Sequence, residues 1–160
     1  MQKITPFLWF DNQAEEAVNF YISVFKNSKI LDISYYGDVG GEISGFKKGD
    51  VLTIAFQLDG QNFTALNGGK HYKINEGISF VVSCDSQEEV DYYWEKLTDG
   101  GEESQCGWLK DKFGVSWQVV PAVLGELMNS PDADKSRRVM EALLQMRKLD
   151  IPALEKAYRG

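Results

Sequence analysis

The sequence predicts an α+β fold in which one small unit occurs twice and a helical extension follows. The order strand, helix, then several strands appears twice along the chain, which is typical of an internal duplication. The two helix starts, residues 11–21 and 85–93, match in chemical type when a gap of two residues is allowed. Apolar stripes at helical spacing then continue beyond both copies. We therefore expect one structural domain with a first module at 1–69, a second module at 70–121 and an extension at 122–160.

The first module begins with a strand of bulky residues, Ile4–Phe10. Asn12 followed by Glu15 resembles a capping box and predicts the start of a helix. Apolar residues then recur at helical spacing, so one face of this helix can pack on a sheet. Asp59-Gly60 is a strong signal for a two-residue hairpin turn. The remaining strands are predicted at Ile30–Tyr36, Val51–Leu58 and Gln61–Asn67.

The second module repeats this order. A strand at Gly77–Cys84 precedes a helix whose capping box is formed by Ser86 and Glu89. Gly100-Gly101 supplies the helix stop. The last strands of the module are predicted at about Glu103–Leu109 and at Val115–Val120.

The last strand of the second module places a polar side chain on the face opposite a tryptophan. Gly114 can take the positive φ that a tight turn needs, and a strand begins there. Successive side chains of a strand point to opposite faces. One face therefore carries Val115, Trp117 and Val119, and the other carries Ser116, Gln118 and Val120.

The extension at 122–160 is predicted to be helical. A first helix spans about 123–128, Ser130-Pro131-Asp132 marks a new helix start, and Asp150 with Pro152 opens a third helix. The apolar stripes of these helices must be buried. Two partners remain open: the chain's own sheets, or the neighbouring subunit of a dimer.

Composition excludes several classes of protein. With 43% hydrophobic residues and a formal charge of −7, the chain suits a globular protein whose partner is neutral or cationic rather than a nucleic acid. The negative charge could also serve solubility alone. The two cysteines, Cys84 and Cys106, lack the spacing of a zinc site or a disulfide scaffold. The apolar run near the N-terminus is too short for a signal peptide or a membrane span, so we expect a cytoplasmic protein.

The stretch from Asp111 to Pro121 also carries a family resemblance. Asp-x-Phe-Gly, three spacer residues and then Glu or Gln, here ending at Gln118, resembles the last strand of the vicinal-oxygen-chelate superfamily, which includes glyoxalase, extradiol dioxygenases and bleomycin-resistance proteins. The residues at 106–111 and 117–121 resemble its PhnB-like branch, often labelled 3-demethylubiquinone-9 3-methyltransferase. The resemblance covers residues 3–160. It implies paired βαβββ modules that form a glyoxalase-like curved-sheet cleft, and a homodimer.

The resemblance also implies where a metal would be held. Metal-binding members place ligands on the first and last strands of each module, which here correspond to Thr5, Asn67, Ser79 and Gln118. None of these is His, Cys, Asp or Glu, so they suit a divalent transition metal poorly. We therefore expect no metal and no other cofactor.

Aromatic and neutral polar side chains are left to line the implied cleft. Such walls fit a small, partly apolar organic ligand. The alternative, that these aromatic residues fill a closed core, stays open. The predicted ligand-binding residues are Phe7, Trp9, Asn67, Ser79, Trp108 and Gln118.

Three functions follow from these expectations. The first is a PhnB-like protein that binds a small organic molecule in a metal-free cleft, with no reaction assigned. The second takes the family label as chemistry, a methyltransferase acting on a ubiquinone precursor, although no glycine-rich nucleotide-binding turn is present. The third is a protein that sequesters a drug or toxin, as in the bleomycin-resistance relatives. Catalysis is left open, as is a purely structural role.

Overall fold

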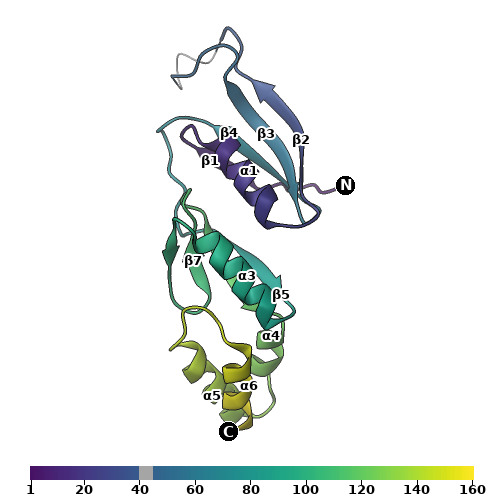
Figure 1. Cartoon of the computed structure of the whole chain (residues 1–160), viewed down its shortest axis with the longest axis vertical. Coiled ribbons are helices and arrows are strands. Elements are labelled where there is room, and N and C mark those ends of the chain that lie inside the picture. The colour runs from purple at the N-terminus through teal and green to yellow at the C-terminus, as the bar shows by residue number, and fades with distance from the viewer. Residues whose placement is uncertain (40–44) are drawn as a thin grey trace. The chain divides into compact units, whose positions relative to one another are not determined.

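The chain forms two compact units, Met1–Ile74 and Asn75–Gly160, in a computed structural model that describes residues 1–39 and 45–160. Each unit has a four-stranded sheet with a helix packed along one face (Figure 1). The second unit also contains three helices near the C-terminus. None of the helices in the described ranges has the length and hydropathy needed to cross a membrane.

The first unit has the predicted βαβββ order. Its sheet is arranged β1-β4-β3-β2, with β1 parallel to β4 and the other neighbours antiparallel. Asp59 and Gly60 both have positive φ, 47° and 77°, as a type I′ hairpin turn requires, which confirms the predicted turn. The elements are β1 (Phe7–Phe10), α1 (Ala14–Val24), β2 (Lys29–Tyr35), β3 (Val51–Leu58) and β4 (Gln61–Asn67).

The core of the first unit lies between α1 and the sheet. One stripe of α1 is buried, and Tyr21 at its centre has no exposed surface. The sheet supplies every second residue of β3 and β4, including Phe56 and Phe63, whose rings stack 5.5 Å apart. These two periodicities, one helical and one of two residues, are what the sequence pattern predicted.

The N-terminus of α1 is capped differently from the prediction. The expected capping box of Asn12 and Glu15 is wrong: the N-cap residue is Gln13, and its side chain makes no capping bond. Instead the Ala14 N–H donates to Asn67 Oδ1 at 2.9 Å, and Asn67 Nδ2 donates to the Val51 carbonyl at 3.1 Å. Asn67, a strand residue brought close by the fold, thus replaces the local cap. No local sequence signal could indicate this long-range contact.

The second unit repeats the order, with the sheet arranged β5-β8-β7-β6. Its helix α3 has the predicted cap, because the Glu89 N–H donates to Ser86 Oγ at 3.2 Å. The strand expected at Glu103–Leu109 is instead two short strands, because Cys106 and Gly107 have positive φ and turn the chain. The elements are β5 (Ser79–Cys84), α3 (Gln87–Thr98), β6 (Glu102–Glu103), β7 (Trp108–Lys110) and β8 (Ser116–Pro121).

The turn before β8 follows the predicted form. Gly114 has a φ of 88°, and its N–H donates to the Asp111 carbonyl at 3.0 Å. The buried Asp111 carboxylate accepts from the backbone N–H of Phe113 and of Val115, and also from Trp117 Nε1 at 2.8 Å. Asp111 therefore fixes both the turn and the position of Trp117 in β8.

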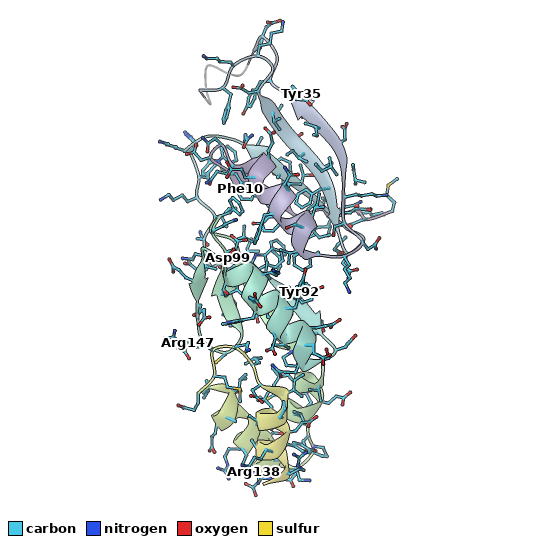
Figure 2. The ribbon with its side chains drawn as sticks, viewed as in Figure 1. Phe10, Tyr35, Tyr92, Asp99, Arg138 and Arg147 are labelled. Atoms are coloured by element: carbon cyan, nitrogen blue, oxygen red, sulfur yellow. The ribbon has the colours of Figure 1, made fainter. Side chains whose placement is uncertain are left out.

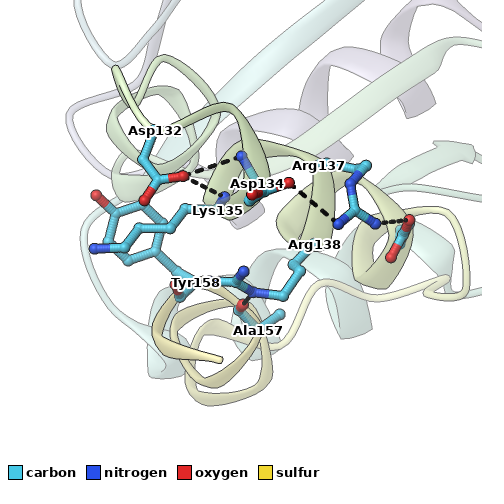
Figure 3. A network of polar contacts seen from close by, with 8 residues as sticks. Asp132, Asp134, Lys135, Arg137, Arg138, Ala157 and Tyr158 are labelled. Atoms are coloured by element: carbon cyan, nitrogen blue, oxygen red, sulfur yellow. Dashed lines mark hydrogen bonds and ion pairs between the residues drawn. The ribbon is translucent and has the colours of Figure 1, made fainter.

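The extension forms helices α4 (Val123–Met128), α5 (Ala133–Leu143) and α6 (Ile151–Arg159). Leu127, Val139, Leu149 and Leu154 form its buried core. Asp132 and Asp150 cap α5 and α6, as the sequence indicated. Figure 3 shows the polar contacts on its surface, where Arg138 Nε donates to the Ala157 carbonyl at 2.9 Å and ties α5 to the end of α6.

The linker between α5 and α6 joins the extension to the sheet part of the second unit. The N–H groups of Cys106 and Gly107 donate to the carbonyls of Met146 and Arg147, both at 2.8 Å (Arg147 is labelled in Figure 2). The amide of Gln87, at the start of α3, donates to the Leu149 carbonyl and accepts from the Ile151 N–H. The helices of the extension bury their apolar stripes against one another, and the linker ties them to the sheet part of the same chain. Packing against a neighbouring subunit stays a prediction.

Candidate functional site

The open face of each sheet, defined as the side opposite its helix, carries the candidate site residues. In the first unit this face presents Phe7, 58% exposed, and the partly buried Trp9. Its polar side chains pair with one another: Ser34 with Thr53 at 2.5 Å, and Gln57 Nε2 with Asn62 Oδ1 at 2.8 Å. These polar pairs are neutral.

Trp9 is held firmly by its surroundings. Its Nε1 donates to the Gly69 carbonyl at 2.9 Å, and its ring meets Tyr72 edge to face at 4.9 Å. The indole lies so close to Gly68 that a Cβ on Gly68 would come within 2.3 Å of a ring carbon. The edge of this ring is therefore covered by backbone, and its hydrogen-bond donor is already used.

Two predicted positions of the first unit are not brought together. Thr5 is exposed and precedes β1, whereas Asn67 is buried on the helix side, at the end of β4 beside Phe10. Strand pairing shows the reason: Phe7 pairs with Thr64 as Val81 pairs with Gln118 in the second unit. Thr64 is thus the counterpart of Gln118. A shift of three residues moves a side chain to the other face of a sheet.

The corresponding positions of the second unit do meet. Gln118 Nε2 donates to Ser79 Oγ at 2.9 Å across the parallel pair β5 and β8. Trp108 is the direct neighbour of Gln118 on β7, so the three predicted residues of this unit share one open face. Val81, 59% exposed, completes the same row.

A cavity of about 260 Å³ lies beside this row in the second unit. It is polar and charged on one side, with one aromatic wall. It extends from the segment before β5 to the middle of the sheet. Its lining residues are Glu76, Glu102, Glu103, Ser104, Trp108, Leu109, Lys110 and Ser116.

The charges around this cavity are partly paired. Lys110 forms an ion pair with Glu76, and this contact lowers the pKa of the Glu76 carboxyl and raises the pKa of the Lys110 ammonium. Glu103 Oε1 accepts from Trp94 Nε1 at 3.1 Å. Glu102 lies opposite Lys110 in the β6–β7 pair. Glu103 shares a row with the buried Leu109, so its carboxylate lies on the helix side, whereas Glu76 and Glu102 both lie near Lys110 on the open face. With three glutamates and one lysine in its lining, the cavity region has a net negative charge.

Ser116 is the buried polar residue of the cavity wall. It is 2% exposed and lies between Ser79 and Lys110 in the same cross-strand row. Its hydroxyl makes no hydrogen bond with any residue in the described part of the chain. Because no enclosed side-chain oxygen or nitrogen among the described residues lacks a partner, this hydroxyl is open to the cavity. A guest in the cavity would supply one.

Neither cysteine forms a nucleophilic centre with the cavity. Cys84 is buried on the helix side of β5, and burial raises the pKa of its thiol to about 12, with Glu89 and Asp85 adding to the effect. A neutral, enclosed thiol is a poor nucleophile. Cys106 lies in the corner before β7, where its Sγ contacts the Leu143 carbonyl at 3.5 Å.

The superfamily's metal does not fit the residues present. Ser79 and Gln118 offer a hydroxyl and an amide that already bond to each other. The side-chain oxygen and nitrogen of Asn67 both have backbone partners. Neutral donors of this kind bind divalent transition metals weakly. Within residues 1–39 and 45–160, no group of three His, Cys, Asp or Glu side chains lies close enough to hold an ion.

Sequence reasoning found the open face but missed the charged part of the cavity. The alternation that placed Gln118 on the face opposite Trp117 also placed Ser116 there, and this is what the structure shows. Lys110 could have been found by extending the same alternation across β7. Glu76 lies in the loop before β5, and only the tertiary fold brings it to Lys110.

The chain has two βαβββ units, and solved structures share this fold. They include the fosfomycin resistance protein FosX from Listeria monocytogenes, at 16% identity and a TM-score of 0.55, with 78% of this chain and 94% of that chain covered. Another structure of that protein is described as complexed with Mn(II) and sulfate ion.

The chain belongs to the family described as 3-demethylubiquinone-9 3-methyltransferase, whose model matches residues 2–120. A Bacillus cereus PhnB protein, titled a putative 3-demethylubiquinone-9 3-methyltransferase, is 38% identical with a TM-score of 0.67. That match covers 76% of this chain and 100% of the other. A Pseudomonas aeruginosa protein is 20% identical, with a TM-score of 0.61 and 76% and 98% covered. No curated protein matches the sequence.

The matched family region ends before the extension begins. Residues 121–160, with α4, α5 and α6, lie outside it. The cavity lies wholly inside the matched region. The homodimer and the cytoplasmic location remain predictions.

Proposed function

We propose that this protein binds a small organic molecule on the open face of its second unit, without a metal ion. The observation that carries the proposal is the cavity of about 260 Å³, with Trp108 as its aromatic wall and the hydroxyl of the largely buried Ser116 open to it. An apolar wall with a few convergent polar groups is typical of ligand sites. The volume is just below the range of about 300 to 1,000 Å³ that is usual for such sites, so the ligand is small.

The row formed by Ser79, Gln118 and Trp108 extends this site along the sheet. The Gln118 amide retains its carbonyl oxygen for a guest after donating to Ser79. The first unit has a separate open face with its own aromatic surface from Phe7 and Trp9, and we place Thr64 on that face instead of Asn67. The site as proposed binds and orients a guest, and no reaction is assigned to it.

Methyltransferase activity is a second candidate function, and its only support is the name of the family. Methyl transfer needs a site for a methyl donor, and the usual nucleotide-binding site of that class lies at the edge of a doubly wound parallel sheet. Each sheet of the described chain has one parallel pair among antiparallel neighbours. Calorimetric titration with S-adenosylmethionine tests this candidate directly.

The binding proposal is tested by a fragment screen on the full chain, followed by nuclear magnetic resonance. Each fragment is added with and without excess EDTA. Indole N–H signals are assigned with Trp108→Phe, and Trp9→Phe serves as the matched control. We expect saturable shifts at the Trp108 indole and at the amides of Ser116 and Gln118, and these shifts should not change with EDTA.

Two results would contradict the proposal. Fragments that bind only elsewhere, with the Trp108 and Ser116 signals unmoved, would remove the second-unit cavity as the site. Binding abolished by EDTA and restored by a stoichiometric divalent metal would overturn the metal-free part. Ser116→Ala should weaken fragments that carry a hydroxyl or amine and leave purely apolar fragments unchanged.

A further inference from the structure

We propose that the second-unit cavity selects a small organic cation that also carries a hydroxyl or amine group. This inference rests on the proposed function, since it names the class of ligand for the same site. It depends on four features of the cavity: its charge, the spacing of its carboxylates, its aromatic wall and its buried hydroxyl.

The charge of the cavity favours a cation. Its single ammonium, on Lys110, is bound to Glu76 and also lies opposite Glu102, so two carboxylates on the open face share one ammonium. The Glu103 carboxylate accepts a neutral hydrogen bond from Trp94 on the helix side and adds a further negative charge nearby. A guest that carries one positive charge would therefore be attracted, and a guest with a negative charge would be repelled.

The spacing of the carboxylates favours an organic cation over a metal ion. All three glutamates line the same cavity, yet among the described residues no three acidic, histidine or cysteine side chains converge closely enough for a metal. A metal ion needs several donors within about 2 to 2.6 Å. A substituted ammonium group is larger, and it can be stabilised by carboxylates spread around the walls.

The aromatic wall suits the same class of ligand. Trp108 is partly buried, and its backbone is fixed by the pairing of β7 with β8. Of the natural aromatic rings, indole attracts a cation most strongly across its face. Lys110 is held by Glu76, so the ring in this cavity is open to an ammonium group from a guest.

The Ser116 hydroxyl gives a second requirement. Its residue is nine-tenths buried or more, it faces the cavity, and no described residue hydrogen-bonds to it. A hydroxyl can both donate and accept. A guest with its own hydroxyl or amine near the cationic group would give Ser116 the hydrogen bond that no protein group supplies.

The probe for this inference is choline, with 3,3-dimethyl-1-butanol as its neutral isostere. Both molecules have the same shape and a hydroxyl, and only choline is charged. The full chain is titrated with each, and the Trp108 indole N–H and Ser116 amide signals are followed. We expect choline to shift both signals saturably and to bind at least about tenfold more tightly than the isostere.

Three variants sharpen the test. Glu102→Gln should weaken choline about three- to tenfold and leave the isostere unchanged. Glu126→Gln removes an exposed charge from α4, outside the cavity lining, and should leave both probes unchanged. Ser116→Ala should weaken both probes equally and leave tetramethylammonium, which lacks a hydroxyl, unaffected.

Each other outcome counts against the inference in a way that separates it from the proposed function. If the isostere binds as tightly as choline at Trp108, the site takes small molecules without regard to charge: the inference falls and the proposed function stands. Tighter binding of the anion 3,3-dimethylbutanoate would lead to the same conclusion. If no probe moves Trp108 or Ser116, the cation inference is overturned, and the fragment screen decides the proposed function alone.

Discussion

The two units share one topology, yet they stabilise it with different contacts. In the first unit, helix α1 is capped from a strand by Asn67, and the polar groups of the open face form neutral pairs. In the second unit, helix α3 is capped locally by Ser86, and the open face carries an ion pair and a cavity. The first unit thus uses its polar residues for the fold, and the second leaves some of them available for a guest.

This difference shows that two units with the same topology need not carry the same site. Thr64 and Gln118 occupy equivalent positions, but only Gln118 bonds to a side chain of the neighbouring first strand, Ser79. The extension adds to the asymmetry, since α4, α5 and α6 belong to the second unit. The comparison can be tested at four places, starting with the change of largest expected effect.

Leu149→Ala tests whether the second unit depends on its extension. Leu149 has no exposed surface, and its side chain lies against Gly107 at the corner before β7. We expect a loss of about 2 to 5 kcal/mol in the free energy of unfolding, because a buried leucine leaves a cavity when truncated. Leu144→Ala, at a position 57% exposed in the same segment, is the control and should change stability by about 0.5 kcal/mol or less. Urea denaturation followed by circular dichroism measures both.

Asn67→Ala tests the long-range cap of the first unit. The change leaves the Ala14 N–H and the Val51 carbonyl without their buried partner. We expect a loss of about 2 to 3 kcal/mol, more than the roughly 1 kcal/mol for Ser86→Ala at the local cap of the second unit. Equal losses in the two variants, measured by urea denaturation, would remove this difference between the units.

Gly68→Ala tests how firmly Trp9 is held on the open face of the first unit. The new Cβ would overlap the indole, so the ring must move at a cost of about 1 to 3 kcal/mol. The Trp9 fluorescence should shift to longer wavelength as its ring becomes hydrated. Gly37→Ala meets open space in the same unit and should leave stability and emission unchanged. An unshifted emission in the Gly68 variant would show that Trp9 is not fixed by this contact.

The smallest effect is expected from pH, and it should come from the second unit. The pKa of Glu76 is lowered by Lys110, so its contribution is present above the unfolded carboxyl pKa, about 4.3, and is lost as pH falls. The pKa of Lys110 is raised, so its contribution is present below about 10.4 and is lost as pH rises through its folded value. Between these limits, wild type should be slightly more stable than Lys110→Met.

This difference should shrink at both ends of the pH range. Denaturation midpoints from pH 3 to pH 11 measure it. The neutral pairs of the first unit cannot contribute, so Gln57→Ala should give a difference from wild type that does not vary with pH. A constant difference for Lys110→Met as well would show that the ion pair adds nothing.

Sequence reasoning succeeded where a signal is local. The hairpin at Asp59-Gly60 and the alternation along β8 were predicted correctly, because turn chemistry and side-chain period are properties of neighbouring residues. The corner at Cys106 was missed, since a non-glycine residue with positive φ gives no compositional signal.

The candidate site was predicted in part for the same reason. Trp108 and Gln118 follow from alternation, and the structure places them side by side. Asn67 was assigned by position in the strand, but its burial and its two backbone partners depend on the packing of α1. The contact between Glu76 and Lys110 joins residues far apart in sequence, and no local pattern predicts it.

The corner at Cys106 and Gly107 has a consequence for the matched family region, which ends at residue 120. Its two N–H groups point to carbonyls from the linker that joins α5 and α6. In a chain that lacks this linker, these two N–H groups would hydrogen-bond to water. The carbonyls of the linker therefore replace water molecules at the start of β7. Removing or replacing the extension of this chain should therefore alter how tightly water is held beside Trp108, even though every lining residue stays the same.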